Sequence, residues 1–192
     1  MKIDNLYNKE GIEVEDLKLI TKDVFNDERG FFLESWNKNE YQKFLGPSFD
    51  CVQLNHSRSI KGVLRGLHYQ LKPQSQGKLV NCFRGKIFDV AVDIRRNSKT
   101  YSSWIGVELK EDLHQSLWIP SGFAHGFLTL SEFADVQYVV SNKWDKNLER
   151  CIIWNDKRIN IDWPLSDKDL LLSKKDLKGQ NLTDAESLQN IF

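Results

Sequence analysis

Net charge is the first property that this sequence lacks. Its 27 lysines and arginines are balanced by 27 aspartates and glutamates, so the formal net charge is zero. A chain without an excess of either sign has no overall field that gathers nucleic acid or an anionic membrane surface. We therefore expect neither a nucleic-acid nor a membrane partner, and any anion-binding site must be local.

Cysteines and long apolar stretches are also scarce. Cys51, Cys82 and Cys151 include no Cys-x-x-Cys pair, which argues against a disulfide framework and against a zinc cluster. No stretch approaches the roughly 20 apolar residues of a membrane-spanning helix, and no apolar segment follows a basic start at the N-terminus. We expect a cytoplasmic protein.

Stretches with the composition of interdomain linkers are absent too. The chain has only four prolines among its 192 residues, no internal repeat and no stretch rich in Pro, Gly and Ser. This length suffices for one well-filled core. We therefore expect a single domain over residues 1–192, with a core of about residues 17–165.

Short runs that favour β-strands dominate the chain. Their number and spacing predict an all-β sandwich or barrel. The expected strands span residues 17–21, 30–36, 49–57, 63–70, 79–83, 86–94, 104–109, 117–119, 127–130, 136–140 and 151–154. Helices are few and peripheral: one over residues 37–45, ended by Gly46 and Pro47, and one from Thr183, whose Thr-Asp-Ala-Glu order fits a capping box.

The run over residues 86–94 alternates apolar and acidic side chains. Side chains of a strand point alternately to opposite faces, so the two kinds separate. We expect one face to be the core and the other to be wetter. The expected core face carries Phe88, Val90, Val92 and Ile94, and the wetter face carries Asp89 and Asp93.

Two histidines lie in the most polar part of the sequence. In the strand of residues 64–70, Leu64, Gly66, His68 and Gln70 share one side unless a bulge occurs at Gly66. His68 then points into the barrel, where a lone histidine is often only a hydrogen-bonded core residue. A second histidine, His125, lies in the glycine-bounded segment of residues 119–127.

The segments around the two histidines resemble the half-motifs of the cupin jelly roll. Metal-binding cupins offer His-x-His, a following Glu and a final His, whereas this chain has Gln70 and Gln74 beside His68 and His125. Neutral amides are poor ligands for transition metals, so we expect a pocket without metal. His68 is then available as a base.

A narrower resemblance covers about residues 17–176. The motifs resemble the dTDP-4-dehydrorhamnose 3,5-epimerase family in order and spacing; they span residues 27–35, 53–57, 63–70, 77–80, 88–95, 119–127 and 173–176. The resemblance implies a cupin-type jelly-roll sandwich, a homodimer and no cofactor. It also implies inversion of C3 and C5 of dTDP-4-dehydro-6-deoxy-D-glucose, giving dTDP-4-dehydro-L-rhamnose through an enolate.

The resemblance also implies catalytic roles. Epimerisation beside a ketone needs a base, a group that stabilises the enolate oxygen, and an acid on the opposite face. By resemblance the base is His68, a residue type whose ordinary pKa of about 6.5 suits the task. Asp176 orients it after residues 166–192 fold back over the site, Lys78 stabilises the oxygen at C4, and Tyr138 returns the proton.

Further family positions imply contacts to the nucleotide and the sugar. They are Arg29, Glu34, Gln53, Asn55, Arg65, Lys78, His125, Trp144, Glu149 and Lys175. Arginine suits a diphosphate because its planar guanidinium makes paired, charge-assisted hydrogen bonds. In dimers of this family Arg29 is expected to reach the partner's site.

Other functions stay open at this point. The chain has Val139 and Lys143-Trp144 where many relatives have a lysine and a Tyr-Tyr pair, so a CDP-linked substrate is an alternative. The motifs also do not separate inversion at both carbons from inversion at C3 alone. The remaining alternatives are a metal cupin that uses His68 and His125 as ligands and a non-catalytic cupin that binds a nucleotide sugar.

Overall fold

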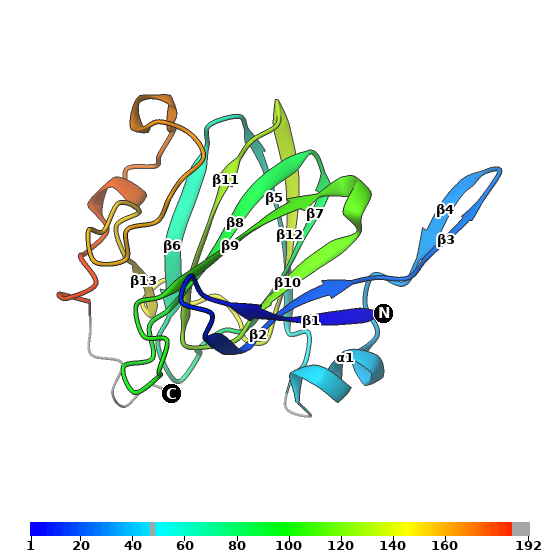
Figure 1. The fold of residues 1–192 in the computed structure, drawn as a ribbon, viewed down its shortest axis with the longest axis horizontal. Helices are drawn as coiled ribbons and strands as arrows, with labels where there is room; N and C mark the ends of the chain where they lie inside the picture. Colours follow the sequence, from blue (N-terminus) through cyan, green and yellow to red (C-terminus); the bar gives the residue numbers. More distant parts are fainter. Residues whose placement is uncertain (47–48, 186–192) are drawn as a thin grey trace.

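Two antiparallel sheets face each other in the computed structural model, which describes residues 1–46 and 49–185 (Figure 1). The larger sheet has the order β1-β2-β10-β7-β12-β5; these strands are Lys2–Tyr7, Glu13–Thr21, Gln115–Ile119, Lys78–Arg84, Phe133–Val140 and Gln53–Ile60. The smaller sheet has the order β13-β6-β11-β8-β9; these strands are Glu149–Cys151, Leu64–Gln70, Phe123–Thr129, Lys86–Asp93 and Trp104–Lys110. The all-β fold expected from the sequence is confirmed.

Few elements lie outside the two sheets. A ribbon of β3 (Val24–Asp27) and β4 (Gly30–Leu33) projects from the body of the molecule (Figure 1). The expected helix is α1 (Lys38–Leu45), where the side chain of Asn37 accepts a hydrogen bond from the backbone N–H of Glu40. Short 3-10 helices span Glu111–Leu113, Asp167–Asp169 and Asp176–Lys178.

The predicted elements differ from the structure in places. Strands β1 and β3 are missing from the prediction, and β13 ends where the predicted strand of residues 151–154 begins. The helix expected from Thr183 falls mostly on residues 186–192, outside the described part of the chain. Within the described part, no helix is long and apolar enough to cross a membrane.

Strand β8 is buried on both faces, which corrects the expected core and wetter faces. Ile87 and Ala91 belong to the core between the sheets, on the same face as Asp89. The opposite face, with Val90 and Val92, packs in a second core that the C-terminal segment covers. The predicted alternation is therefore present, but the face with Asp89 points inward.

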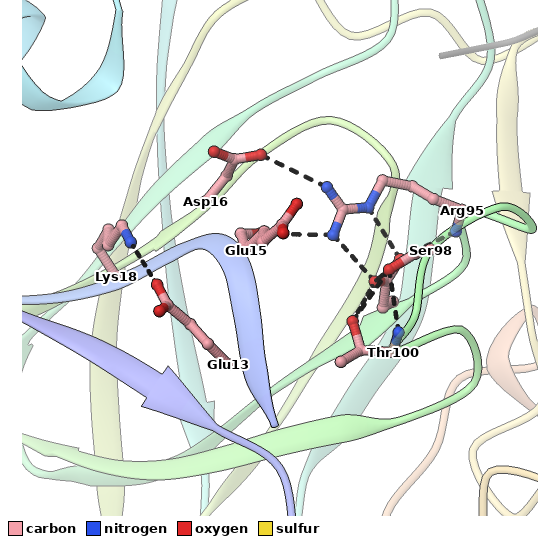
Figure 2. A network of polar contacts seen from close by, with 8 residues as sticks. Glu13, Glu15, Asp16, Lys18, Arg95, Ser98 and Thr100 are labelled. Atoms are coloured by element: carbon pink, nitrogen blue, oxygen red, sulfur yellow. Dashed lines mark hydrogen bonds and ion pairs between the residues drawn. The ribbon is translucent and has the colours of Figure 1, made fainter. Parts of the chain in front are cut away.

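Asp93 is also fully buried, at the end of β8, within a polar network whose residues Arg95, Ser98 and Thr100 are labelled in Figure 2. Its carboxylate accepts hydrogen bonds from Arg95, Ser98 and Thr100. Arg95 also donates to the backbone carbonyl of Glu15, at 3.4 Å, in strand β2 of the other sheet. The network therefore connects the two sheets at one end of the sandwich.

A bulge in β6 changes which side chains face the interior. His68 pairs with His125 and Arg65 pairs with Phe127, so β6 has one residue more than β11 between these pairs. Gly66 lies in the bulge with φ +118°, and a Cβ there would be 2.6 Å from the His125 carbonyl oxygen. The stated exception for a bulge at Gly66 therefore applies, and Arg65 and His68 line the same cavity instead of pointing to opposite sides of a regular strand.

Candidate active site

A cavity of about 580 Å³ opens between the two sheets. Its walls come from β5, β6, β7, β11, β12 and β13 and from the C-terminal segment. Most of the residues expected at the site line it, namely Asn55, Arg65, His68, Lys78, His125, Tyr138, Trp144, Glu149, Lys175 and Asp176.

His68 and Asp176 form a hydrogen-bonded pair in this cavity. The distance between His68 Nε2 and Asp176 Oδ1 is 2.6 Å, and Asp176 is only 3% exposed. The Ser173 hydroxyl donates to the other carboxylate oxygen at 2.7 Å. Burial acts to raise the pKa of Asp176, but hydrogen bonds from His68 and Ser173 outweigh it and lower the pKa. The pair is therefore a histidine held by an ionised carboxylate.

Lys78 brings a cation into the same cavity from β7. Its ammonium group donates to the backbone carbonyl of His68 at 3.3 Å. Burial lowers the pKa of Lys78 from 10.5 to about 8, against the opposing charges of Glu149 and Asp89. The ammonium is therefore charged at neutral pH, in an environment where its field is little screened.

Tyr138 reaches the cavity from β12, on the sheet opposite the one that carries His68. Its hydroxyl lies 3.3 Å from Ser57 Oγ, and its ring centroid lies 6.0 Å from that of His125. Burial raises the pKa of Tyr138, so the phenol keeps its proton at neutral pH. An imidazole and a phenol thus line opposite walls of one cavity.

A second histidine–carboxylate pair consists of His125, which lines the cavity, and Asp89. His125 Nε2 is 2.7 Å from Asp89 Oδ1, and both residues are buried. Burial lowers the pKa of His125 against the field of Asp89, which keeps the imidazole neutral. Asp89 was not predicted as a site residue, although an acid in an otherwise apolar strand is a signal that could have identified it. Ser57 and Ser173 were missed as well.

Polar and aromatic side chains surround the mouth of the cavity. Trp144 is 51% exposed there, and Lys175 forms an ion pair with Glu149 at 2.5 Å. Gln53 lies behind this layer: its side chain accepts a hydrogen bond from the backbone N–H of Trp144 and donates to Asn55. Gln53 therefore supports residues of the cavity wall.

Arg29 and Glu34 are not brought to the cavity of their own chain. Arg29 lies in the projecting ribbon, with a side chain that is 84% exposed and an ion pair to Asp27. Glu34 follows β4 and accepts a hydrogen bond from the Asn37 side chain. The same ribbon exposes Phe31 and Phe32, at 60% and 71%.

The residues that a metal cupin would use are otherwise engaged. The side chain of Gln70 donates to the backbone carbonyls of Gln74 and Lys143 and accepts from the backbone N–H of Asp145. His125 Nε2 faces Asp89. In the described part of the chain, the group whose atoms lie close enough for one metal ion is His68, Cys151 and Asp176.

Two facing antiparallel sheets with histidines on paired strands of their inner wall define a cupin-type jelly roll. Within that class, the chain belongs to the dTDP-4-dehydrorhamnose 3,5-epimerase family, whose sequence profile matches residues 11–184. A dTDP-4-dehydrorhamnose 3,5-epimerase of Shigella flexneri is 51% identical over 91% of this chain and 95% of its own length. One of Pseudomonas aeruginosa is 49% identical over 91% of this chain and 96% of its own length.

Solved structures support the same family assignment. The dTDP-6-deoxy-D-glucose-3,5-epimerase of Legionella pneumophila, in complex with dTDP-4-keto-L-rhamnose, is 42% identical and superposes with a TM-score of 0.88; the match covers 96% of this chain and 95% of that one. The dTDP-4-dehydrorhamnose 3,5-epimerase of Bacillus anthracis, with TDP and PPi bound, is 38% identical with a TM-score of 0.84, covering 94% and 99%.

Proposed function

We propose that this enzyme inverts C3 and C5 of dTDP-4-dehydro-6-deoxy-D-glucose and releases dTDP-4-dehydro-L-rhamnose, using its own side chains alone. The observation that carries the proposal is the placement of the paired His68 and the protonated Tyr138 on opposite walls of one cavity. A base on one side of a sugar ring and an acid on the other are what inversion next to a ketone requires.

His68 is the proposed base. Asp176 occupies Nε2, so proton transfer falls to Nδ1, and the carboxylate stabilises the imidazolium that forms when the proton arrives. The proton leaves the carbon beside the C4 ketone, and its bonding electrons move into the enolate. Asp176 is held by Ser173, which fixes the orientation of the ring.

Lys78 is the proposed partner of the enolate oxygen. Its charged ammonium in a buried site stabilises negative charge at the C4 oxygen more strongly than the same group would in water. Tyr138 then delivers a proton to the opposite face of the carbon, which completes the inversion. The neutral His125, backed by Asp89, offers the sugar another hydrogen-bonding group in the same cavity.

The remaining lining residues are proposed to hold the nucleotide. Arg65 supplies a guanidinium for the diphosphate, and Trp144 offers an exposed indole on which a base can stack. The bound molecules named for the relatives, dTDP-4-keto-L-rhamnose and TDP, support thymidine over cytidine. A relative named as a 3'-monoepimerase is only 28% identical, so the C3-only alternative has less support.

The proposed assembly is a homodimer in which the ribbon of β3 and β4 covers the partner's cavity. Its exposed Phe31 and Phe32 are apolar surface that a second copy would bury, and Arg29 lies in the same ribbon. Mixing Arg29→Ala with His68→Ala protein tests this, because a mixed dimer regains one complete site. Random mixing should restore about a quarter of wild-type sites; no recovery would contradict the shared site.

We further propose that the whole chain works as one domain, because the C-terminal segment both packs on the smaller sheet and supplies Asp176. The cytoplasmic location stays a prediction from the sequence.

Proton NMR in heavy water tests the reaction. The protein is incubated with dTDP-4-keto-6-deoxy-D-glucose, and the C3 and C5 proton signals are followed separately. Loss of both signals is expected. Loss of the C3 signal alone would indicate a monoepimerase, and full retention of both would indicate a binding protein.

A further inference from the structure

Cys151 is a side chain beside the His68–Asp176 pair that the proposed reaction does not use. It lies on β13, directly opposite His68 on β6. Its sulfur is 3.9 Å from Asp176 Oδ1, and one ligand atom from each of His68, Cys151 and Asp176 lies within 4.8 Å of the other two. Three different donor atoms therefore converge at the wall of the cavity.

This set of donors is chemically selective. Imidazole nitrogen, thiolate sulfur and carboxylate oxygen are the three protein ligands that zinc uses, and soft thiolates favour zinc-like ions over magnesium or calcium. With zinc–nitrogen and zinc–sulfur bonds of about 2.0 and 2.3 Å, ligand atoms on a tetrahedral ion are roughly 3.3 to 3.6 Å apart. The distance of 3.9 Å between Cys151 Sγ and Asp176 Oδ1 is close to this range. The distance of 2.6 Å between His68 Nε2 and Asp176 Oδ1 would have to increase by less than about 1 Å to admit the ion.

We propose that His68, Cys151 and Asp176 form an inhibitory site for a thiophilic divalent ion such as Zn²⁺, whose fourth ligand is a water on the cavity side. The inhibition rests on the proposed function. The ion binds His68 Nε2, the atom that faces Asp176, so the imidazole proton moves from Nε2 to Nδ1 and the proposed base has no free lone pair for the substrate proton. The thiol proton is released to solvent on binding, and no electrons are transferred.

The surroundings support three-ligand binding. Ser173 holds the Asp176 oxygen that faces away from His68, as hydrogen-bonded neighbours of metal-bound carboxylates commonly do. The thiolate and the carboxylate together neutralise a divalent ion. Of the nearby lysines, Lys175 is already paired with Glu149, which reduces its repulsion of a cation.

Binding is tested first without substrate, on the purified, metal-stripped protein. Cobalt(II) alone should produce a sulfur-to-cobalt absorption band, and zinc alone should displace it. Cys151→Ala should lose the band and bind zinc more than about 100-fold more weakly, since even the loss of a residue that hydrogen-bonds to a metal ligand costs 10- to 100-fold in affinity. The matched control Cys51→Ala, which removes a half-buried cysteine elsewhere, should keep both. Absence of the band in wild type, or its persistence in Cys151→Ala, overturns the proposal.

Inhibition is tested second, by heavy-water exchange into the nucleotide sugar. Zinc should stop exchange by wild type and Cys51→Ala, a chelator should restore it, and magnesium should have no effect. Cys151→Ala should exchange normally and tolerate at least about 100-fold more zinc. Equal sensitivity of Cys151→Ala contradicts the inhibitory role. An enzyme that binds cobalt through sulfur but never exchanges would refute the proposed function while leaving the metal site intact.

Discussion

The reaction should lose rate in alkali because Lys78 loses its proton. Burial in the cavity lowers the pKa of Lys78 from 10.5 to about 8, so the ammonium begins to discharge only slightly above neutral pH. Only the charged form stabilises an enolate oxygen. Initial rates of deuterium exchange should therefore be about halved near pH 8 and should fall by about tenfold per pH unit above about pH 9.

Replacing the amine tests whether this group causes the fall. In Lys78→Met the charge is absent at every pH, so kcat should be lower by about 10²- to 10³-fold, the usual cost of one oxyanion-stabilising donor. The alkaline fall in rate should vanish with it. The measurement is the initial exchange rate between pH 6 and pH 10, by proton NMR in heavy water.

Lys22 provides the matched control. Burial also lowers its pKa to about 8, but its ammonium lies outside the cavity and donates to Asn81 and Ser116. Lys22→Met should keep both the wild-type rate and its alkaline fall. If the fall persists in Lys78→Met, or disappears in Lys22→Met, the assignment to Lys78 is refuted.

Four further variants test other parts of the structure. His68→Ala should abolish exchange at C3 and C5, while calorimetry should still detect dTDP binding. Asp176→Asn should lower kcat by up to about 10⁴-fold, because the imidazole loses its orienting anion. Exchange at the wild-type rate in either variant would exclude the pair from the reaction. Tyr138→Phe should still lose substrate protons to solvent but return them to the wrong face, so an unchanged ratio of inverted product would argue against its role as the acid. Lys22 binds a proton less tightly in the folded chain than in the unfolded one, so its own contribution to stability should rise with pH between about 8 and 10.5, by roughly 3 kcal/mol at most. Lys78 makes a similar contribution in both proteins, so the measurement is the difference in urea-unfolding free energy between wild type and Lys22→Met, which should grow in favour of wild type over this range.

Strand patterns predicted the fold class, but local irregularities decided which side chains face inward. Alternation along β8 separated Asp89 from Val90 as expected, yet it could not reveal that both faces are covered. Burial on the second face depends on the C-terminal segment, which lies far away in the sequence. Similarly, the bulge at Gly66 puts Arg65 on the same wall as His68, which strict alternation forbids.

The site was predicted more completely by resemblance than by pattern. No periodicity links His68 to Asp176, since their contact depends on how the final segment crosses the sheet. The partnership of His125 with Asp89 was missed because a charged residue in a strand ordinarily indicates a solvated face. Arg29 and Glu34 show the opposite limit: one chain places both away from its own cavity, and the expected role of Arg29 depends on a second copy.

The separation of 108 positions between His68 and Asp176 has a consequence for how the protein is made. A ribosome delivers the chain from its N-terminus, so the strands around His68 can pair while residue 176 has not yet been synthesised. During that interval the imidazole has no carboxylate beside it, and by the proposed mechanism the nascent polypeptide is expected to be inactive. Transcripts cut short before codon 176 should therefore yield inert products, even where most of the sandwich has folded.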